Sequence, residues 1–340
     1  MLLMNDRKNT AFATRRRAAG RAFGLAAVLG SAGFAAACLL PAPTLPAPPS
    51  AAAPRSAPLR DAQLGTALAN PQSPLLVMHA RRNGVPFILI EGGVPQTRRS
   101  PLRAGVPQIV AQARAQAGLN GTFFVNASLR GTDNALIGPS LCGNEASAVF
   151  NPADRNALLA GRPLVLLSPA QTRLVPYDPP AMGSQKELES WLPGLTDAFL
   201  GGVWLVHDGV AADRERIDDY HVRDAEDQRR RAFFCLLPDG RPALGATTYV
   251  TPSADLALAL SEIGVREAVL LDSGFSTSLV YGGKILVTGH TSPGIPSRPV
   301  PHALVLFGKP APHTPRVVLM ARRIQGCEAP LPAAKCQSVP

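Results

Sequence analysis

The chain has 340 residues, 46% of them hydrophobic, which is enough to build a domain with a substantial core and excludes disorder of the whole chain. Its net charge is +10, but residues 1–60 hold eight Lys/Arg and one Asp and so supply +7 of that charge. Because the rest of the chain has 26 basic against 23 acidic residues and only 5% aromatic residues overall, the composition argues against nucleic-acid binding.

An export signal is predicted for residues 1–40. Arginines at positions 15–17 and 21 precede an uncharged run of 19 residues, Ala22 to Leu40, which is the order of a charged n-region and an apolar h-region. The run includes Ala35-Ala36-Ala37-Cys38, so three outcomes stay open: cleavage after the small residues, lipidation of Cys38, or retention as a membrane anchor. All three place the rest of the chain outside the cytoplasm, in the periplasm or outer cell envelope, with the membrane as a partner.

Three segments follow this signal. Residues 41–70 are predicted to be a Pro/Ala-rich linker, since seven prolines lie between positions 41 and 60 and favour extended, solvated backbone. Residues 71–310 form the expected domain, and residues 311–340 form a C-terminal tail.

Four cysteines lie beyond the signal, in a compartment that permits disulfides. Cys327 with Cys336 would close a short loop in the tail, which leaves Cys142 with Cys235 as the second candidate pair. Their spacings contain no C-x-x-C, and no His lies close to them, so no metal site is predicted. No cofactor is predicted either, and a need for a divalent metal stays open.

A β-hairpin and a helix are expected first in the domain. The apolar runs 75–80 and 85–91 flank an Asn-Gly turn, which is typical of a hairpin. Apolar residues then recur at helical spacing from Val106 to Ala117, with Gly118 at the expected helix end.

A buried strand and a long excursion come next. Residues 119–126 begin with Asn-Gly and contain an aromatic pair, which indicates a turn entering a buried strand. Residues 127–160 have few periodic apolar positions, so they are interpreted as a surface excursion that forms a candidate lid.

The second half is rich in strands. Strands are predicted at 203–206, 230–237, 268–271 and 300–307, a hairpin turns at Gly282-Gly283, and a helix starts at Thr251-Pro252 and ends at Gly264. Helices and strands are mixed without strict alternation. The fold class is therefore predicted as mixed α/β (α+β), with a central mixed β-sheet flanked by helices in a single domain.

The segment from Leu270 to Ser278 is the main candidate for chemistry. A buried strand ends at Asp272, and ligands commonly bind at the carboxyl ends of strands in such sheets. Asp272 is interpreted as an acid, a base or a clamp on a hydroxyl, and the alternative is that it only caps the Ser-Gly turn.

Ser276 raises a serine hydrolase as a weaker alternative. Its surroundings resemble the G-x-S-x-G elbow except that Ser278 replaces the last glycine and strand residues follow. The base would have to be His207, His290 or His302.

Two arginines and one asparagine are further candidates. Arg230 begins an apolar strand, and Arg298 lies between Pro296 and Pro299 in a rigid approach to the last strand; either guanidinium group could bind phosphate oxygens or belong to a solvated charged cluster. Asn120 could hold a sugar hydroxyl or cap a turn.

Five of these segments, in this order, resemble motifs of the phosphodiester glycosidase family. The motifs are Asn120-Gly121-Thr122-Phe123-Phe124, Gly202 to Gly209, Arg230-Arg231-Ala232 with Asp239-Gly240, Leu271 to Ser276, and Arg298 to Leu304. The resemblance implies a mixed α/β fold and hydrolysis of a sugar from a sugar-1-phosphodiester, in exopolysaccharide or wall-glycan metabolism. The implied partner is a glycan or sugar-phosphodiester.

The resemblance also implies which residues form the site. The candidate catalytic residues are Asp272 and Arg230, with Glu145 or Asp208 as a second carboxylate. The candidate substrate-binding residues are Asn120, Gly121, Gly274, Ser276, Arg298 and His302.

This chain departs from the family motifs in the site loops. Ser273 and Phe275 replace two glycines of D-G-G-G-S, Thr122 replaces the second glycine of N-G-G, and His302 stands where an Asn is usual. A phenyl ring in such a loop is expected to narrow or block the site. A catalytically impaired carbohydrate-binding envelope protein on the same fold is therefore the alternative function.

Overall fold

The computed structural model describes residues 72–125, 134–150, 157–292, 294–311 and 316–317. The expected signal and anchor, the linker and nearly all of the tail lie outside these residues, and with them Cys38, Cys327 and Cys336. Parts of the expected excursion at 127–160 lie outside them as well. Among the residues described, we find no helix with the length and apolar character needed to cross a membrane.

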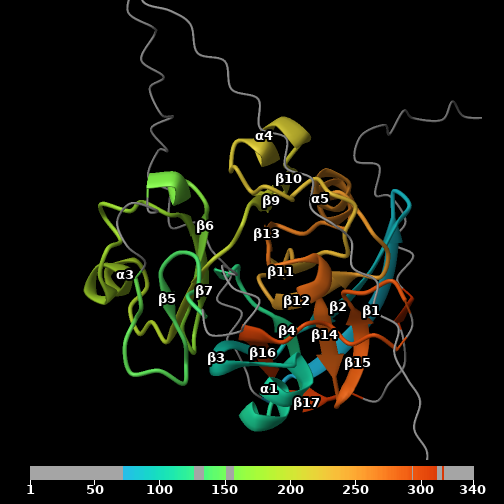
Figure 1. The fold of residues 1–340 in the computed structure, drawn as a ribbon, viewed down its shortest axis with the longest axis horizontal. Helices are drawn as coiled ribbons and strands as arrows, with labels where there is room; N and C mark the ends of the chain where they lie inside the picture. The colour runs from blue at the N-terminus through green and yellow to red at the C-terminus, as the bar shows by residue number, and fades with distance from the viewer. Residues whose placement is uncertain (1–71, 126–133, 151–156, 293, 312–315, 318–340) are drawn as a thin grey trace, which may run out of the picture. The chain divides into compact units, whose positions relative to one another are not determined.

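The largest sheet has nine strands, with β13, β11, β12 and β2 side by side in its centre (Figure 1). Its order is β10-β9-β13-β11-β12-β2-β1-β17, and β18 also pairs with β1. The pairs are antiparallel except those of β1 with β17 and β18. The bounds are β1 Pro74–Arg82, β2 Val85–Glu91, β9 Trp204–His207, β10 Val210–Ala211, β11 Ala232–Leu236, β12 Pro242–Thr247, β13 Glu267–Leu270, β17 Lys309–Pro310 and β18 Arg316–Val317.

A second sheet of five strands is stacked against the first. Its order is β15-β14-β4-β16-β3, and all of its pairs are antiparallel. The bounds are β3 Val94–Ala104, β4 Ala117–Asn120, β14 Ser278–Tyr281, β15 Lys284–Thr288 and β16 Val300–Phe307.

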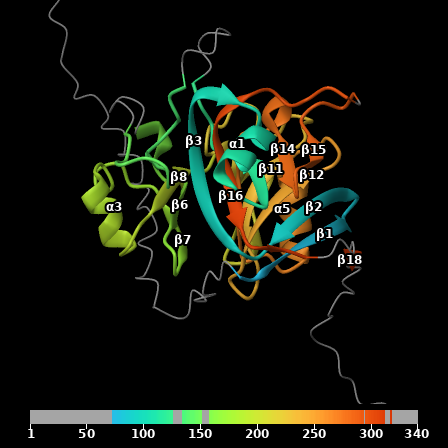
Figure 2. The same cartoon turned by 90° about the horizontal axis from the view of Figure 1, so that it is seen from below.

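A third, smaller sheet lies beside β3, as Figure 2 shows from below. Its order is β5-β8-β6-β7, with bounds β5 Ser140–Leu141, β8 Asp197–Leu200, β6 Pro163–Leu167 and β7 Thr172–Pro176. The buried carboxylate of Asp197 on β8 accepts hydrogen bonds from the Thr97 backbone N at 2.6 Å and the Thr97 hydroxyl at 2.7 Å. These bonds fasten the small sheet to β3.

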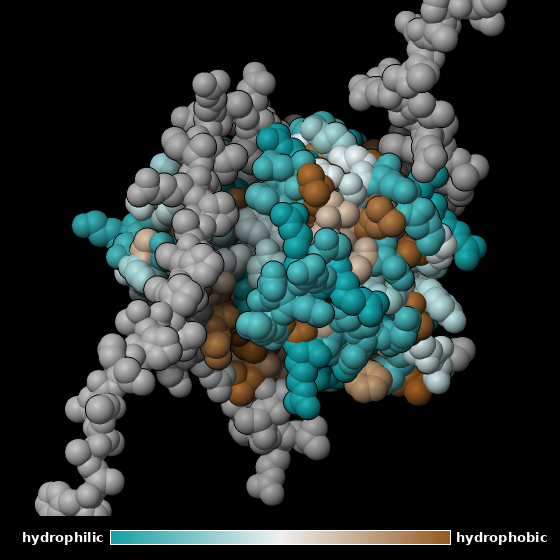
Figure 3. Space-filling view, turned by 90° about the horizontal axis from the view of Figure 1, so that it is seen from above, coloured by the Kyte–Doolittle hydropathy of each residue, from teal (hydrophilic) through white to brown (hydrophobic). Residues whose placement is uncertain are grey.

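Helices cover the outer faces. The α-helices are α1 Val106–Ala113, α3 Gln185–Trp191, α4 Arg214–Asp218 and α5 Ser253–Glu262, and 3-10 turns span Ala157–Leu159 and Gly274–Ser276. Figure 3 views the side that carries α4, where much of the described surface is hydrophilic and hydrophobic side chains are partly scattered and partly gathered beside the segment drawn in grey.

Strand alternation builds the core. On β2, Ile88 and Ile90 point into the cluster between the two large sheets, whereas Phe87 and Leu89 point into the cluster under α5. The α1 helix packs on the opposite face of the five-stranded sheet, with Val106 and Ile109 in a cluster of their own. The layers are therefore helix, sheet, sheet, helix.

These observations confirm the predicted mixed α/β fold with helices outside, although the strands form three sheets instead of one central sheet. The hairpins β1–β2 and β14–β15, helix α5 and strand β16 lie where the sequence predicted them. The helix expected over 106–117 ends earlier, because Arg114 takes a left-handed conformation with φ of 56° and the chain enters β4 at Ala117. Gly118 lies within β4, where a Cβ would overlap the Val110 side chain of α1.

Candidate functional site

The loop after β13 is fixed between the two large sheets. The backbone N of Asp272 donates to Gly121 O at 3.2 Å, and Gly274 N donates to Arg230 O at 2.9 Å. Gly274 has a φ of +64°, and a Cβ there would lie 3.2 Å from Cδ of Arg229. The left-handed backbone conformation therefore favours glycine at this position, and a Cβ would also press against the Arg229 side chain.

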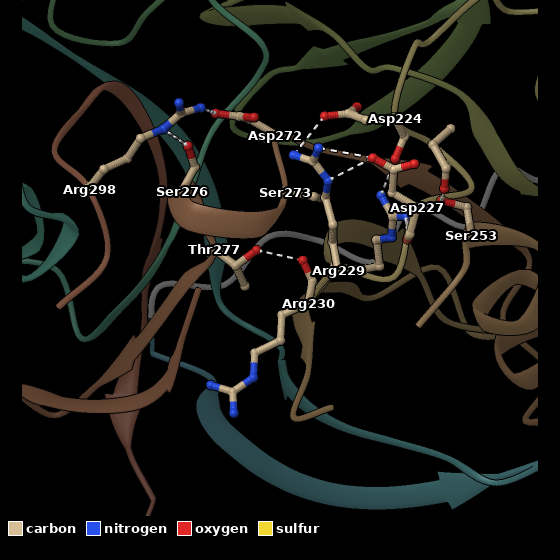
Figure 4. Close-up of polar contacts among 12 residues, drawn as sticks. Asp224, Asp227, Arg229, Arg230, Ser253, Asp272, Ser273, Ser276, Thr277 and Arg298 are labelled. Atoms are coloured by element: carbon tan, nitrogen blue, oxygen red, sulfur yellow. Dashed lines mark hydrogen bonds and ion pairs between the residues drawn. The ribbon is translucent and has the colours of Figure 1, made fainter. Parts of the chain in front are cut away.

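Asp272, Ser276 and Arg298 converge in this loop (Figure 4). The Arg298 guanidinium donates from Nη2 to Asp272 Oδ2 at 3.0 Å and from Nε to Ser276 Oγ at 2.6 Å. Ser276 is fully buried and the Asp272 side chain is 11% exposed, whereas the Arg298 side chain is 34% exposed. The arginine therefore links a buried carboxylate and a buried hydroxyl to the surface.

The protonation of Asp272 is set by two opposing effects. Burial raises the pKa of Asp272, and the charge of Arg298 and the hydrogen bond from Ser276 oppose that rise. The net direction is upward, so this carboxyl holds its proton to a higher pH than an exposed aspartic acid does.

Phe124 orients the arginine from the side. The Arg298 guanidinium carbon lies 5.0 Å from the centroid of the Phe124 ring, and the Arg103 guanidinium carbon lies 4.7 Å from it. The backbone N of Arg298 donates to Phe275 O at 2.8 Å. The aromatic pair in the Asn-Gly segment hinted at a buried strand, but nothing in the sequence indicated that Phe124 would face arginines.

Asn120, Gly121 and His302 lie beneath the loop and position it. Asn120 is fully buried; its Nδ2 donates to Asp272 O at 2.5 Å and its Oδ1 accepts from Ser278 N at 3.0 Å. His302 Nδ1 accepts from Thr122 N at 3.0 Å, and a Cβ on Gly121 would overlap the imidazole. Burial lowers the pKa of His302 to about 3, so the ring is neutral, as its acceptor role requires.

Arg230 does not join this group, because its side chain points away from Asp272 and Arg298 (Figure 4). Its Nη1 donates to the backbone oxygens of Thr288 and His290, both at 2.8 Å.

The two arginines beside it have different partners. Arg229 forms ion pairs with Asp224 at 2.9 Å and Asp227 at 3.0 Å, which matches the charged-cluster alternative. Arg231 is fully buried and donates to the backbone oxygens of Thr251, Asp224 and Asp227.

Of the two candidate second carboxylates, Glu145 is linked through Arg99 to the strand pair that carries His302. Its Oε1 lies 3.6 Å from Nε of Arg99, and Arg99 stands opposite His302 in the pairing of β3 with β16. Among the described residues, Oε2 of Glu145 and Nε2 of His302 are buried without a hydrogen-bond partner. Unpaired polar atoms of this kind are uncommon in a folded interior and favour a site for a polar ligand.

Asp208 lies near the start of β13, at the end of that strand away from Asp272. Its backbone N donates at 3.0 Å to Glu267, the first residue of β13, whereas Asp272 follows the end of β13; five extended residues span roughly 16 Å. His207 also bonds Glu267, at 2.9 Å, and this bond raises the pKa of His207. His207, Asp208 and Glu267 offer atoms within 4.8 Å of one another that could hold a metal ion. The hydrogen bonds that Glu267 makes with His207 and with the backbone N of Asp208 are enough to account for the grouping of these three residues.

The serine hydrolase alternative lacks its base. Ser276 Oγ is held by Arg298, His302 is held by Thr122, and His290 stacks on Phe275 with ring centroids 4.7 Å apart. None of the hydrogen bonds found among the described residues joins Ser276 to a histidine.

Cys142 and Cys235 are not joined. Both thiols are free and buried, Cys142 near Thr97 and Glu145 and Cys235 within β11. The two cysteines lie in different parts of the fold, which their positions in the sequence could not show. Burial raises the pKa of Cys142 to about 12, so its thiol stays protonated.

Comparison with known proteins identifies a family. The profile of the phosphodiester glycosidase family matches residues 113–307, more than half of the chain. No curated protein sequence matches.

Three solved structures resemble this chain at low sequence identity, and the first of them has a TM-score above 0.5. The catalytic domain of zebrafish N-acetylglucosamine-1-phosphodiester alpha-N-acetylglucosaminidase, auto-inhibited by its pro-peptide, is 13% identical with a TM-score of 0.52, over 70% of this chain and 83% of that one. A hypothetical protein from Synechocystis is 13% identical with a TM-score of 0.46, over 68% of this chain and 61% of that one. A putative exported protein from Burkholderia pseudomallei is 15% identical with a TM-score of 0.42, over 66% and 74%. Because the family profile covers more than half of the chain, the chain belongs to the phosphodiester glycosidase family.

Proposed function

We propose that the chain is an exported hydrolase that releases a sugar from a sugar-1-phosphodiester of an envelope glycan. The family and the fold support an activity on phosphodiester-linked sugars, the class that the zebrafish enzyme's name describes. The observation that carries the proposal is the contact of Arg298 with buried Asp272 and Ser276.

Arg298 binds the phosphodiester in this proposal. Its Nε and Nη2 are engaged by Ser276 and Asp272, so Nη1 is the donor that meets a non-bridging phosphate oxygen. The fixed guanidinium group then neutralises the phosphate charge without reorganising during the reaction.

Asp272 supplies the proton. Its raised pKa keeps a larger fraction of the carboxyl protonated near neutral pH than in an ordinary aspartic acid. Hydrolysis breaks the bond between the anomeric carbon and the bridging oxygen; the proton of Asp272 passes to that oxygen, and the phosphomonoester leaves.

Glu145 is the proposed partner for water. Its Oε2 has no partner among the described residues and its Oε1 is held by Arg99, so the carboxylate is available to take a proton from water. The water oxygen joins the anomeric carbon, and the free sugar is released.

The first test is hydrolysis of a panel of methyl sugar-1-phosphodiesters by the wild-type chain and an Asp272→Asn variant. We expect kcat/KM to fall about 100-fold or more, the usual range for loss of a general acid. Asp208→Asn is the matched control, because it neutralises a half-exposed carboxylate at the far end of β13 and is expected to keep full activity. Equal activity of the wild type and the Asp272→Asn variant would contradict the role of Asp272.

The alternative function, a carbohydrate-binding protein with impaired catalysis, is favoured by Arg230, whose side chain lies away from Asp272. Binding of a methyl sugar-1-phosphodiester without turnover in the same panel would establish that alternative.

A further inference from the structure

A groove lies on the other side of the Asp272 loop. It has a volume of about 480 Å³ and is lined by Asp227, Gln228, Arg229, Arg230, Val250, Gly274, Phe275, Gly289, His290, Thr291 and Ser292. Asp272 and Arg298 are not among its lining residues, so the groove is separate from the site described above.

The groove has an exposed aromatic wall. Phe275 is 59% exposed, and one face of its ring stacks on His290, with centroids 4.7 Å apart and planes 21° apart. The 3-10 turn points Phe275 outward while Ser276 points inward to Arg298. The phenyl ring therefore lies outside the contact of Asp272 with Arg298 and does not block that contact.

Arg230 provides a positive charge in the same groove. Its Nη1 is fixed by the backbone oxygens of Thr288 and His290, and no ion pair to it is found among the described residues. Asp227, the acidic residue in the lining, is already paired with Arg229. Among the lining residues two arginines stand against one aspartate, and Arg230 is the one without an ion pair among the described residues, which favours an anionic ligand at its guanidinium group.

Hydrogen bonds between the segments that line the groove hold its walls in place. Thr277 Oγ1 donates to Arg230 O at 2.9 Å, and Ser297 Oγ donates to Thr277 O at 2.6 Å and accepts from Gly289 N at 3.0 Å. A Cβ on Gly289 would overlap Gly274 O. Such a pre-formed groove loses little entropy when it binds a ligand.

We propose that this groove is a binding subsite for an anionic sugar, with the sugar ring on Phe275 and its phosphate or carboxylate on Arg230. The apolar C–H face of a pyranose covers the exposed phenyl ring, which removes apolar surface from water. Arg230 meets the anionic group through Nη2. The proposal rests on the proposed function only in supposing that this sugar belongs to the glycan being cleaved, and binding is tested independently of turnover.

Binding is measured by NMR titration of the full-length protein with glucose 6-phosphate, glucose and inorganic phosphate. We expect glucose 6-phosphate to bind at least tenfold more tightly than either of the other two, because only it engages both walls. Phe275→Ala should weaken that binding at least fivefold, and Phe275→Trp, which keeps an aromatic face, should preserve it. Leu258→Ala, at a half-exposed apolar residue on α5, controls for loss of surface hydrophobicity.

Two further variants separate this proposal from the catalytic one. Arg230→Gln should weaken binding of glucose 6-phosphate, whereas Arg298→Gln should leave it unchanged. Loss of binding with Arg298→Gln, and its retention with Phe275→Ala, would assign the ligand to the Asp272 site and overturn the groove proposal. Binding that depends on Phe275, without turnover of any phosphodiester, would refute the proposed function and leave the groove standing.

Discussion

The contribution of Asp272 to the free energy of unfolding depends on pH. Because burial raises its pKa, the folded state holds this proton more tightly than the unfolded chain does. The resulting stabilisation is fully present below the ordinary pKa of an aspartic acid and is lost as the pH rises through the raised pKa.

Replacing Asp272 with asparagine should therefore improve stability at neutral pH. Asparagine resembles the protonated carboxyl and can still accept from Arg298, so the variant avoids the buried charge that forms in the wild type as the pH rises through the raised pKa of Asp272. We expect its free energy of unfolding, relative to wild type, to be higher at pH 7 than at pH 4, measured by urea denaturation at both values. The Asp208→Asn variant corrects for the general effect of removing a negative charge. A relative stability that instead increases toward pH 4 would show that attraction to Arg298 outweighs burial.

At the level of single residues, the sequence predicted some site members and missed others. Asp272 and Ser276 come from one loop, and Arg298 reaches them from the segment before β16, in the order that the motifs suggested. The direction of the Arg230 side chain could not be predicted. Arg230 precedes β11, and side chains alternate between the two faces of the sheet only from Ala232 onward. Which of two adjacent arginines faces a site depends on backbone angles that the sequence pattern leaves undetermined.

Among the secondary-structure elements, the junction of β4 with β16 supports the site. Gly121 N donates to His302 O at 2.9 Å while Gly121 O accepts from Asp272 N at 3.2 Å. The residue that follows β4 is thus bonded to β16 on one side and to the loop after β13 on the other.

A methyl group at Gly121 should disrupt this junction. In a Gly121→Ala variant the new Cβ would lie 2.7 Å from Cγ of buried His302, which has no room to move without breaking its bond to Thr122. We expect a loss of about 2 kcal/mol or more in the free energy of unfolding, typical of overpacking in a core, together with lower activity. Chemical denaturation measures the stability change.

Gly183→Ala is the matched control for this prediction. A Cβ on Gly183 would meet its nearest neighbour, Pro179 O, at 3.5 Å, an ordinary contact, so that variant should stay within about 0.5 kcal/mol of wild type. Equal changes in the free energy of unfolding for the two substitutions would show that overlap with His302 does not destabilise the Gly121→Ala variant.

Elements with strong local signals were predicted well from the sequence. The Asn-Gly turn gave the β1–β2 hairpin because Asn83 and Gly84 both take positive φ, at 46° and 77°. The end of α1 was placed too late, since the pattern of apolar residues continues into β4 and conceals the left-handed turn at Arg114. The third sheet was missed because β5 to β8 lie in a region where periodicity is weak and long-range pairing decides the structure.

For the whole molecule, the arrangement of layers depends on pairings between distant segments. Strand β16 lies between β3 and β4, although it begins 180 residues after the end of β4 and 196 after the end of β3. No local pattern encodes such pairings, so the sequence could give the fold class and the family motifs but not the stacking of the sheets. The fold is nevertheless shared with the zebrafish domain at 13% identity, because burial patterns persist when individual residues change.

The proposed location of the molecule is tested at its N-terminus. Residues 1–40 combine arginines, an apolar run and Cys38, and lipidation of that cysteine would hold the domain at the membrane through a proline-rich linker. We expect the full-length chain, expressed in a Gram-negative host fed with labelled palmitate, to incorporate the label, and the Cys38→Ser variant to incorporate none. A single acyl chain binds membranes only weakly, so stable anchoring needs a second one. The mass of the mature protein should therefore correspond to a polypeptide that begins at Cys38 and carries more than one acyl chain. An unmodified chain beginning just after the alanines would instead indicate a cleaved secretory signal, and an intact 340-residue chain in the membrane fraction would indicate an anchor.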